Sequence, residues 1–294
     1  MNKILLVGNG AFSKALYKVL TENEENELTM WSPNTHFKKK KLNMTYALDD
    51  AIQNNDFIFI LVSTPYLEKI LEQVLKNDLT NKILLVGTKG LLPKKPYFIS
   101  EYLDNKKIAY SIFGGPNLAK ELEKMSPTSI TFSTNSLVRK SEISSLWPSF
   151  IKPIFITKAI SLEICNNLKN IYAIGAGMIN SLYPFQNTHF TYLNEVIKEL
   201  QSLLGEDIYP FLGDLLLTCS MNDSRNFTYG TLMNEKNKRK KYLLKNTVEG
   251  LANLETINFI LKNKKITLPI FEGIYESLSL NKVSDKLKEA IFHN

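Results

Sequence analysis

The sequence predicts an α/β protein in which an N-terminal, doubly wound parallel sheet is followed by an all-helical C-terminal domain. Short apolar runs alternate with segments of helical spacing through the first half, which is typical of βαβ units. Beyond residue 157 the spacing is helical and strand signals disappear. We therefore expect a first domain over residues 1–157 and a second over residues 158–294.

The first domain is predicted from short apolar runs bounded by glycines and turn residues, with a helix over Ala11–Leu20 after the first run. The expected strands are Lys3–Val7, Glu27–Trp31, Asp56–Ser63, Lys82–Gly87, Lys107–Phe113, Thr128–Phe132 and Ile154–Thr157. In the second domain, Ile164–Met178 is apolar nearly all round when drawn as a helix, which indicates burial. This helix nevertheless carries Lys169 in its middle, and a buried ammonium calls for a reason.

Composition narrows the classes of function. The chain has 294 residues, 44% of them hydrophobic and 22% charged, as in ordinary globular proteins. The formal charge of +7 favours anionic ligands. Because the lysines are spread out and form no basic stripe interleaved with aromatics, we expect no nucleic-acid partner.

The cysteines, the histidines and the N-terminus point to a cytoplasmic protein. Cys165 and Cys219 suggest buried free thiols in a reducing compartment, and the three histidines are too scattered to predict a metal site. The opening MNKILLVGNG is too short an apolar run for a signal peptide. No stretch reaches the length of a membrane span, so we expect no stable membrane insertion.

A glycine-rich turn follows the first expected strand and opens a helix. It reads Gly8-x-Gly10-x-x-Ser13. The first glycine permits the tight turn, and the second lets the backbone approach a pyrophosphate at the helix N-terminus. The strand–turn–helix context favours a Rossmann-type dinucleotide site over an ordinary βα turn.

The segment after the second strand bears on the choice of cofactor. An acid there would bind the ribose 2′-hydroxyl of NAD, but Thr29–His36 contains none. Lys38–Lys41 follow and could meet a 2′-phosphate, although a lysine run is also typical of a solvated face. NADPH is therefore favoured, and NADH stays possible.

Further motifs carry a family resemblance. In order, the chain shows an aromatic after the second glycine, TKGL, GGPNLAKE, LKN, GDLLLTC leading to SRN, and a late VEG. Together they resemble the NAD(P)-dependent glycerol-3-phosphate dehydrogenase family, as a divergent bacterial-type member, over nearly the whole chain. The chain departs from the family pattern at Pro33, Asn117 and Leu118, in the SLYPFQ segment before Asn187, and in the PFL segment before Gly213.

The resemblance implies roles for individual residues. Lys169 would be the catalytic acid or base, because a lysine in a poorly solvated pocket can stabilise a carbonyl oxygen and deliver a proton. Asp214 would be its counter-charge; a helix-capping aspartate is the alternative. The implied substrate contacts are Lys89, Gly115, Asn117, Ser224, Arg225 and Asn226. The implied cofactor contacts are Gly8, Gly10, Ala11, Phe12, Lys89, Ala119, Arg225 and Glu249.

Arg225 offers a planar fork suited to phosphate oxygens, although an SRN tripeptide can also hold a surface salt bridge. The leading interpretation is an enzyme that interconverts dihydroxyacetone phosphate and sn-glycerol 3-phosphate for phospholipid synthesis. Its rivals are a related 2-ketoacid or ketopantoate-type reductase and a catalytically weak, nucleotide-binding regulatory protein. The expected partner is a small phosphorylated substrate, and the sequence leaves a homodimer open.

Overall fold

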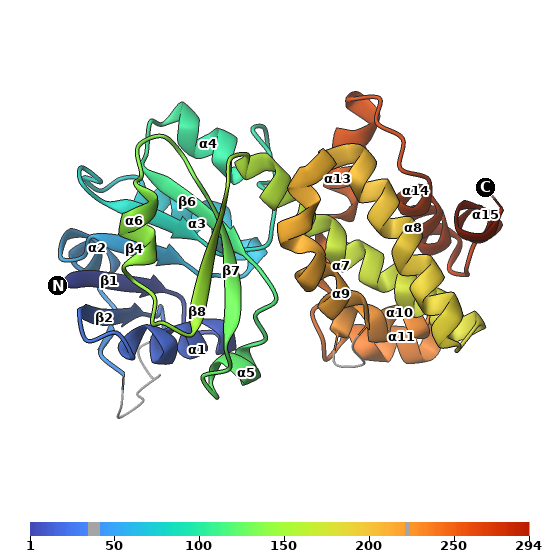
Figure 1. The fold of residues 1–294 in the computed structure, drawn as a ribbon, viewed down its shortest axis with the longest axis horizontal. Helices are drawn as coiled ribbons and strands as arrows, with labels where there is room; N and C mark the ends of the chain where they lie inside the picture. Colours follow the sequence, from blue (N-terminus) through green and yellow to red (C-terminus); the bar gives the residue numbers. More distant parts are fainter. Residues whose placement is uncertain (35–41, 221–223, 294) are drawn as a thin grey trace. The chain divides into compact units, whose positions relative to one another are not determined.

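The computed structural model describes residues 1–34, 42–220 and 224–293. The chain divides into two compact units, Met1–Glu163 and Ile164–Asn294, which are described separately. This division falls after Glu163, whereas the change of spacing in the sequence predicts a boundary after residue 157. The predicted α/β fold with a helical second part is confirmed (Figure 1).

The first unit is built on an eight-stranded sheet with the order β3-β2-β1-β4-β5-β6-β7-β8. All neighbouring pairs are parallel except β6 and β7, which are antiparallel. The strands are β1 Asn2–Val7, β2 Asn26–Trp31, β3 Met44–Thr45, β4 Phe57–Ile60, β5 Ile83–Val86, β6 Tyr110–Gly114, β7 Thr128–Thr134 and β8 Ile151–Ile156. The helices are α1 Ala11–Thr21, α2 Leu48–Gln53, α3 Thr64–Val74, α4 Ile99–Asn105, α5 Ala119–Leu122 and α6 Lys140–Ser144.

Every predicted strand is present, with ends that shift by a few residues. The sequence missed β3, because a strand of two residues has no periodicity to detect. It also gave no sign that β7 reverses direction, since an apolar run does not encode the direction of its pairing. Pro153 is tolerated in β8 because this strand lies at the sheet edge.

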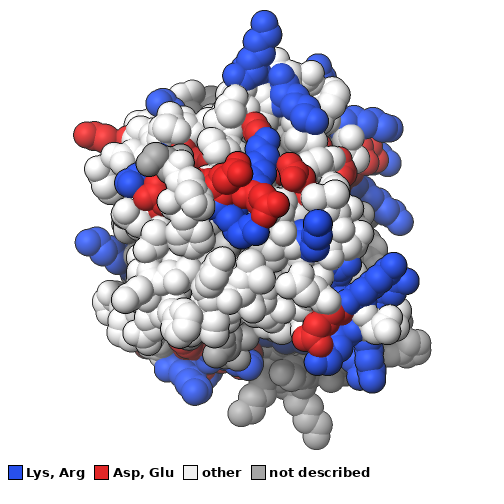
Figure 2. All heavy atoms as spheres, turned by 90° about the vertical axis from the view of Figure 1, so that its right-hand side faces the viewer, with Lys and Arg blue, Asp and Glu red and all other residues white. Residues whose placement is uncertain are grey.

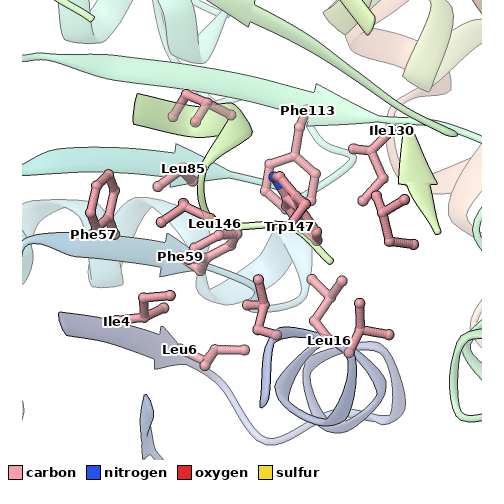
Figure 3. Packing of buried hydrophobic residues seen from close by; sticks show 14 of the residues in the cluster. Ile4, Leu6, Leu16, Phe57, Phe59, Leu85, Phe113, Ile130, Leu146 and Trp147 are labelled. Atoms are coloured by element: carbon pink, nitrogen blue, oxygen red, sulfur yellow. The ribbon is translucent and has the colours of Figure 1, made fainter. Parts of the chain in front are cut away.

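One hydrophobic core of the first unit lies against the face of the sheet where alternate strand residues meet helix α1 (Figure 3). Ile4 and Leu6 of β1 and Leu16 of α1 are completely buried there. Aromatic rings fill the adjoining space: Phe59 packs edge-on to Phe113, with ring centroids 5.8 Å apart. This packing fixes β1 and α1, and hence the glycine turn between them.

The second unit is helical, and its described residues include no strand. Helix α7, Ala159–Leu182, begins in the first unit and continues from Ile164 in the second; it is buried along most of its length, as the sequence predicts. It is followed by α8 Gln186–Leu204, the 3-10 helix η1 Gly205–Phe211, α9 Leu212–Ser220, α10 Arg225–Thr231, α11 Lys236–Leu243, α12 Glu249–Ala252, α13 Leu254–Asn263, α14 Pro269–Leu280 and α15 Asp285–Phe292.

Helices α7 and α10 cross at two glycines. A Cβ on Gly177 would lie 2.0 Å from the backbone oxygen of Phe227, and a Cβ on Gly230 would lie 2.0 Å from that of Ile174. Only glycine allows so close an approach. The crossing brings the start of α10 beside the middle of α7, which matters for the site below.

Charge is mixed on the face of the second unit that Figure 2 shows. Basic and acidic side chains lie among one another there, and the coloured residues form no continuous basic stripe. Ion pairs join some of the exposed charges in this unit, such as Lys286 with Glu272 at 2.6 Å. Within the described part of the chain, no helix has the length and apolar character needed to cross a lipid bilayer.

Candidate active site

The glycine turn of the first unit is shaped by a close backbone contact. Strand β1 ends at Val7, and Gly8 has φ +124°, a conformation that side chains disfavour. A Cβ on Gly8 would lie 2.9 Å from the backbone oxygen of Leu61. Gly8 is therefore required by the fold itself.

Gly10 has a different role, because the space around it is open. It is the N-cap of α1 with φ −65°, and a Cβ at this position would meet no described atom within 4 Å. The first turn of α1 contains no acid. Its backbone N–H groups and positive dipole end therefore suit a phosphate, and the turn fits the pyrophosphate of a dinucleotide.

Ser13 explains the missing third glycine of the motif. Its side chain is buried, and its hydroxyl donates to the backbone oxygen of Gly8 at 2.5 Å. The serine side chain thus links the first turn of α1 to the glycine turn by a hydrogen bond. Of the other predicted cofactor residues here, Ala11 is exposed and Phe12 packs partly buried against the core.

The end of β2 offers neutral hydrogen-bonding groups. Ser32 is buried, and its hydroxyl accepts from the Asn9 side chain at 2.9 Å and from the Asn34 backbone at 3.2 Å. No acid stands in the described residues that directly follow this strand, up to Asn34. Lys38–Lys41, on which the NADPH prediction partly rests, lie outside the described residues.

Lys89 and Gly115 follow strands β5 and β6, which run parallel to β1, so both lie at the same sheet edge as Gly8. Lys89 is half-buried. The preceding Thr88 donates to the backbone oxygen of Val62 at 2.9 Å and so ties this loop to the one after β4. The carboxyl edge of a doubly wound sheet is where such folds bind ligands.

Asn117 turns back onto the sheet. Its Nδ2 donates to the backbone oxygen of Ser129 at 3.3 Å, and its Oδ1 is buried with no partner among the described residues. A Cβ on Gly115 would lie 2.8 Å from that Nδ2, so the two residues fit each other. Ala119 begins the short helix α5. Ligand contacts by Asn117, Gly115 and Ala119 stay predictions.

In the second unit, Lys169 and Asp214 form a buried ion pair. Lys169 comes from the middle of α7 and Asp214 from the first turn of α9, and each is 4% exposed. The expected counter-charge is therefore present, which answers how the ammonium is tolerated. A buried lysine held by one carboxylate has a fixed position and is shielded from bulk water.

Beside this pair, asparagines join α7, α10 and α12. The Asn226 amide donates to Asn170 Oδ1 at 3.0 Å, and Asn226 Oδ1 accepts from the Gly250 backbone at 2.9 Å. Asn170 Nδ2 donates to Glu249 at 3.4 Å. Asn170 was not among the predicted site residues, although its position directly after Lys169 in the LKN motif was a usable signal.

Arg225 and Ser224 stand at the start of α10. Arg225 is exposed, and its Nη2 lies 3.4 Å from Glu249 Oε1. Ser224 is the N-cap, and its hydroxyl accepts from the Phe227 backbone at 3.3 Å. The predicted residues of the second unit thus form two neighbouring groups. One is the Lys169–Asp214 pair, and the other consists of Arg225, Asn226 and Glu249. Their ligand contacts stay predictions.

Comparisons with known proteins identify the family of the chain. The model of the NAD-dependent glycerol-3-phosphate dehydrogenase N-terminus matches residues 33–138, and that of the C-terminus matches residues 159–289. The glycerol-3-phosphate dehydrogenase (NAD(P)+) of Mesoplasma florum is 28% identical, with 99% of this chain and 97% of the relative covered. That of Oceanobacillus iheyensis is 26% identical, with 96% and 91% covered.

Among solved structures, the glycerol-3-phosphate dehydrogenase of Coxiella burnetii has a TM-score of 0.84 at 21% identity, covering 99% of this chain and 97% of that one. At this identity the likeness supports the fold, while the matched family models and the relatives support the assignment to a family. Because the models of both halves match and relatives of the same description align over nearly the whole length, the chain belongs to the NAD-dependent glycerol-3-phosphate dehydrogenase family.

Proposed function

We propose that the protein is an NAD(P)-dependent oxidoreductase that interconverts dihydroxyacetone phosphate and sn-glycerol 3-phosphate, and that its product feeds phospholipid synthesis. The observation that carries the proposal is the buried ion pair of Lys169 and Asp214, set in a chain of this family. The NAD(P)+ relatives support the same redox chemistry.

Lys169 is proposed as the acid and base of the reaction. When bound, the nicotinamide supplies the hydride. Reduction of a ketone places negative charge on the carbonyl oxygen, and an ammonium beside that oxygen stabilises the charge and gives up a proton. In the reverse direction the amine accepts the proton of the alcohol. Asp214 holds Lys169 in one position throughout.

Arg225 is proposed to bind the substrate phosphate, with Ser224, Asn226 and Lys89 near the substrate. A guanidinium presents paired donors that match phosphate oxygens. Glu249 Oε1 lies 3.4 Å from Arg225 Nη2 and is proposed to orient the guanidinium. Because both amide atoms of Asn226 already bond within the protein, its proposed contribution is to hold α10 in place, with a second amide hydrogen left for substrate.

The turn from Gly8 to Phe12 is proposed to hold the cofactor pyrophosphate, with Lys89, Ala119, Arg225 and Glu249 as further contacts. NADPH is the proposed preference, supported by the absence of an acid in the described residues directly after β2. A cytoplasmic location is supported by two buried, unpaired cysteines in the described chain. Homodimer formation and the lack of a nucleic-acid partner stay predictions.

Absorbance at the reduced-nicotinamide band tests the proposal most simply. Dihydroxyacetone phosphate and ketopantoate are each supplied with NADPH and, separately, with NADH. We expect oxidation of NADPH with dihydroxyacetone phosphate and none with ketopantoate. Turnover of ketopantoate instead would favour the rival reductase. Tight nucleotide binding without turnover of either ketone would favour the regulatory protein.

A further inference from the structure

A small cavity of about 10 Å³ lies beside the Lys169–Asp214 pair. Its polar lining consists of Asn166 and Lys169 from α7 and Asp214 from α9. Cys165 and apolar side chains from α8, η1 and α9 form the rest of the wall. Every residue that lines the cavity is buried. The cavity therefore belongs to the interior of the second unit and is in direct contact with the ion pair.

Asn166 differs from the other two buried asparagines of α7. Asn167 accepts from Asn253 at 2.7 Å, and Asn170 accepts from Asn226 at 3.0 Å. The Asn166 side chain is only 3% exposed, yet its amide has no hydrogen-bond partner within residues 1–34, 42–220 and 224–293. Buried amides in folded proteins are nearly always paired, and the cavity that Asn166 lines offers space for such a partner.

The size of the cavity identifies that partner. A space of roughly 10–15 Å³ available to a water-sized probe holds a single water molecule, provided that two to four polar groups surround it. Three polar residues of the lining, Asn166, Lys169 and Asp214, can supply such groups. A larger ligand does not fit, and an apolar guest would leave the amide unpaired.

We propose that this cavity binds one water molecule, that the water links the Asn166 amide to the Lys169–Asp214 pair, and that Asn166 is thereby a positioning residue for Lys169. The role of Asn166 rests on the proposed function of Lys169, whereas the water site does not. A primary amide suits the task because it both donates and accepts without adding a charge beside the ion pair. A bridging water binds nearly as well as a direct hydrogen bond.

A crystal structure of the full chain, at a resolution that shows ordered waters, tests the site without any need for turnover. We expect one water within hydrogen-bond distance of the Asn166 amide and of at least one member of the ion pair. In the Asn166→Leu variant that water should be missing. A dry cavity in the natural protein, or an Asn166 amide bonded to protein atoms instead, would overturn the proposal.

Kinetics test the positioning role. Because a hydrogen bond to the charged pair is lost, Asn166→Leu should lower kcat for dihydroxyacetone phosphate by on the order of tenfold. KM and the cofactor dissociation constant should stay within about twofold, since none of the residues proposed to bind the phosphate or the cofactor lines the cavity. Asn166→Ser, whose hydroxyl can still hold the water, should recover part of kcat.

The matched control is Asn167→Leu, a neighbouring buried asparagine whose amide accepts from Asn253. It should lower the thermal unfolding temperature and leave kcat of the folded enzyme nearly unchanged. Equal losses of kcat in the Asn166→Leu and Asn167→Leu variants would reduce Asn166 to a structural role. If neither the natural protein nor any variant turns over a ketone, the proposed function fails. The crystal structure would still decide whether the cavity holds a water.

Discussion

The two units of the chain are built for ligands in different ways. In the first unit the candidate site is formed mainly by backbone groups. They belong to the glycine turn, the ends of the strands and the N-terminus of α1. In the second unit it is side chains held inside the helices. The buried charged residues of the described chain show the difference, since Glu163 lies in the first unit and Lys169, Glu199, Asp214 and Arg239 lie in the second.

The difference teaches which substitutions each site tolerates. A backbone site is damaged by an added Cβ, whereas a side-chain site is damaged by the loss of a charged or hydrogen-bonding group. Buried charge alone does not mark a catalytic residue. Glu199 accepts from the Tyr172 hydroxyl at 2.8 Å and from the Ile270 backbone at 2.7 Å, and so caps the start of α14. Lys169 instead faces a carboxylate beside a cavity.

The largest expected effect is that of Lys169→Met. Loss of a positioned acid typically costs on the order of 10²–10⁴ in rate, so turnover of dihydroxyacetone phosphate should nearly disappear. Steady-state kinetics measures it, with Lys198→Met, an exposed lysine of α8, as the control. Turnover within about twofold of the natural protein would remove Lys169 from the mechanism.

Glu163 is the one buried charged residue among the described residues of the first unit, and its titration can be tested. It accepts from the Ile99 backbone at 2.7 Å, and burial raises the pKa of its carboxyl to about 7 from an ordinary value of 4.5. Because the pKa is higher in the folded than in the unfolded state, the folded state holds the proton more tightly. The stabilising contribution is therefore full below about pH 4.5 and is lost as the pH rises through about 7.

Across that pH range the free energy of unfolding should fall by about 3 kcal/mol on account of Glu163. Glu163→Gln should remove this part of the slope, because glutamine does not titrate. Urea unfolding of both chains at several pH values between these limits measures the difference. Parallel pH dependences of the two chains would contradict the prediction.

Arg225→Lys should damage substrate use although the charge is kept. Lysine lacks the paired donors that fix a phosphate, and a lost charge-assisted hydrogen bond is worth roughly 1.5–3 kcal/mol, or about one to two decades in kcat/KM. The loss should fall on dihydroxyacetone phosphate and spare unphosphorylated dihydroxyacetone. Arg139→Lys, at an exposed arginine of the first unit, is the control. A proportional loss on both substrates would assign Arg225 to the cofactor or the fold.

The smallest effects separate the two glycines of the turn. Gly8→Ala forces a Cβ towards the Leu61 oxygen at φ +124° and should lower stability by roughly 1–3 kcal/mol. Gly10→Ala meets open space at φ −65°, so stability should hold while NADPH binding weakens, because the added Cβ would enter the space proposed for the cofactor phosphate. Thermal unfolding and fluorescence titration distinguish them. Equal destabilisation by both changes would mean that the turn has no role beyond the fold.

Much of the fold could be predicted, because strands and helices of this chain repeat their apolar residues with clear periods. The predicted strands are all present, and the helical second half is confirmed. The two-residue β3 and the antiparallel β7 could not be predicted. Both features depend on how segments that are distant in sequence pair with one another, and local residue patterns do not predict that pairing.

The candidate site follows the same rule. Gly8 and Gly10 are visible in sequence because a local motif defines them. The ion pair of Lys169 with Asp214 was expected from the need to neutralise a buried ammonium, and the structure contains it. The bond from Asn226 to Asn170 and the cavity beside Asn166 could not be foreseen, since both depend on how α7 packs against α9 and α10.

The central claim is that the first unit binds the cofactor through its backbone while the second performs the chemistry through buried side chains. The most direct test measures both kcat for dihydroxyacetone phosphate and the NADPH dissociation constant in Gly10→Ala and in Lys169→Met. We predict a crossed result: Gly10→Ala raises the dissociation constant and spares kcat at saturating NADPH, whereas Lys169→Met abolishes kcat and spares the dissociation constant. If both variants change the same parameter and leave the other alone, the claim is contradicted.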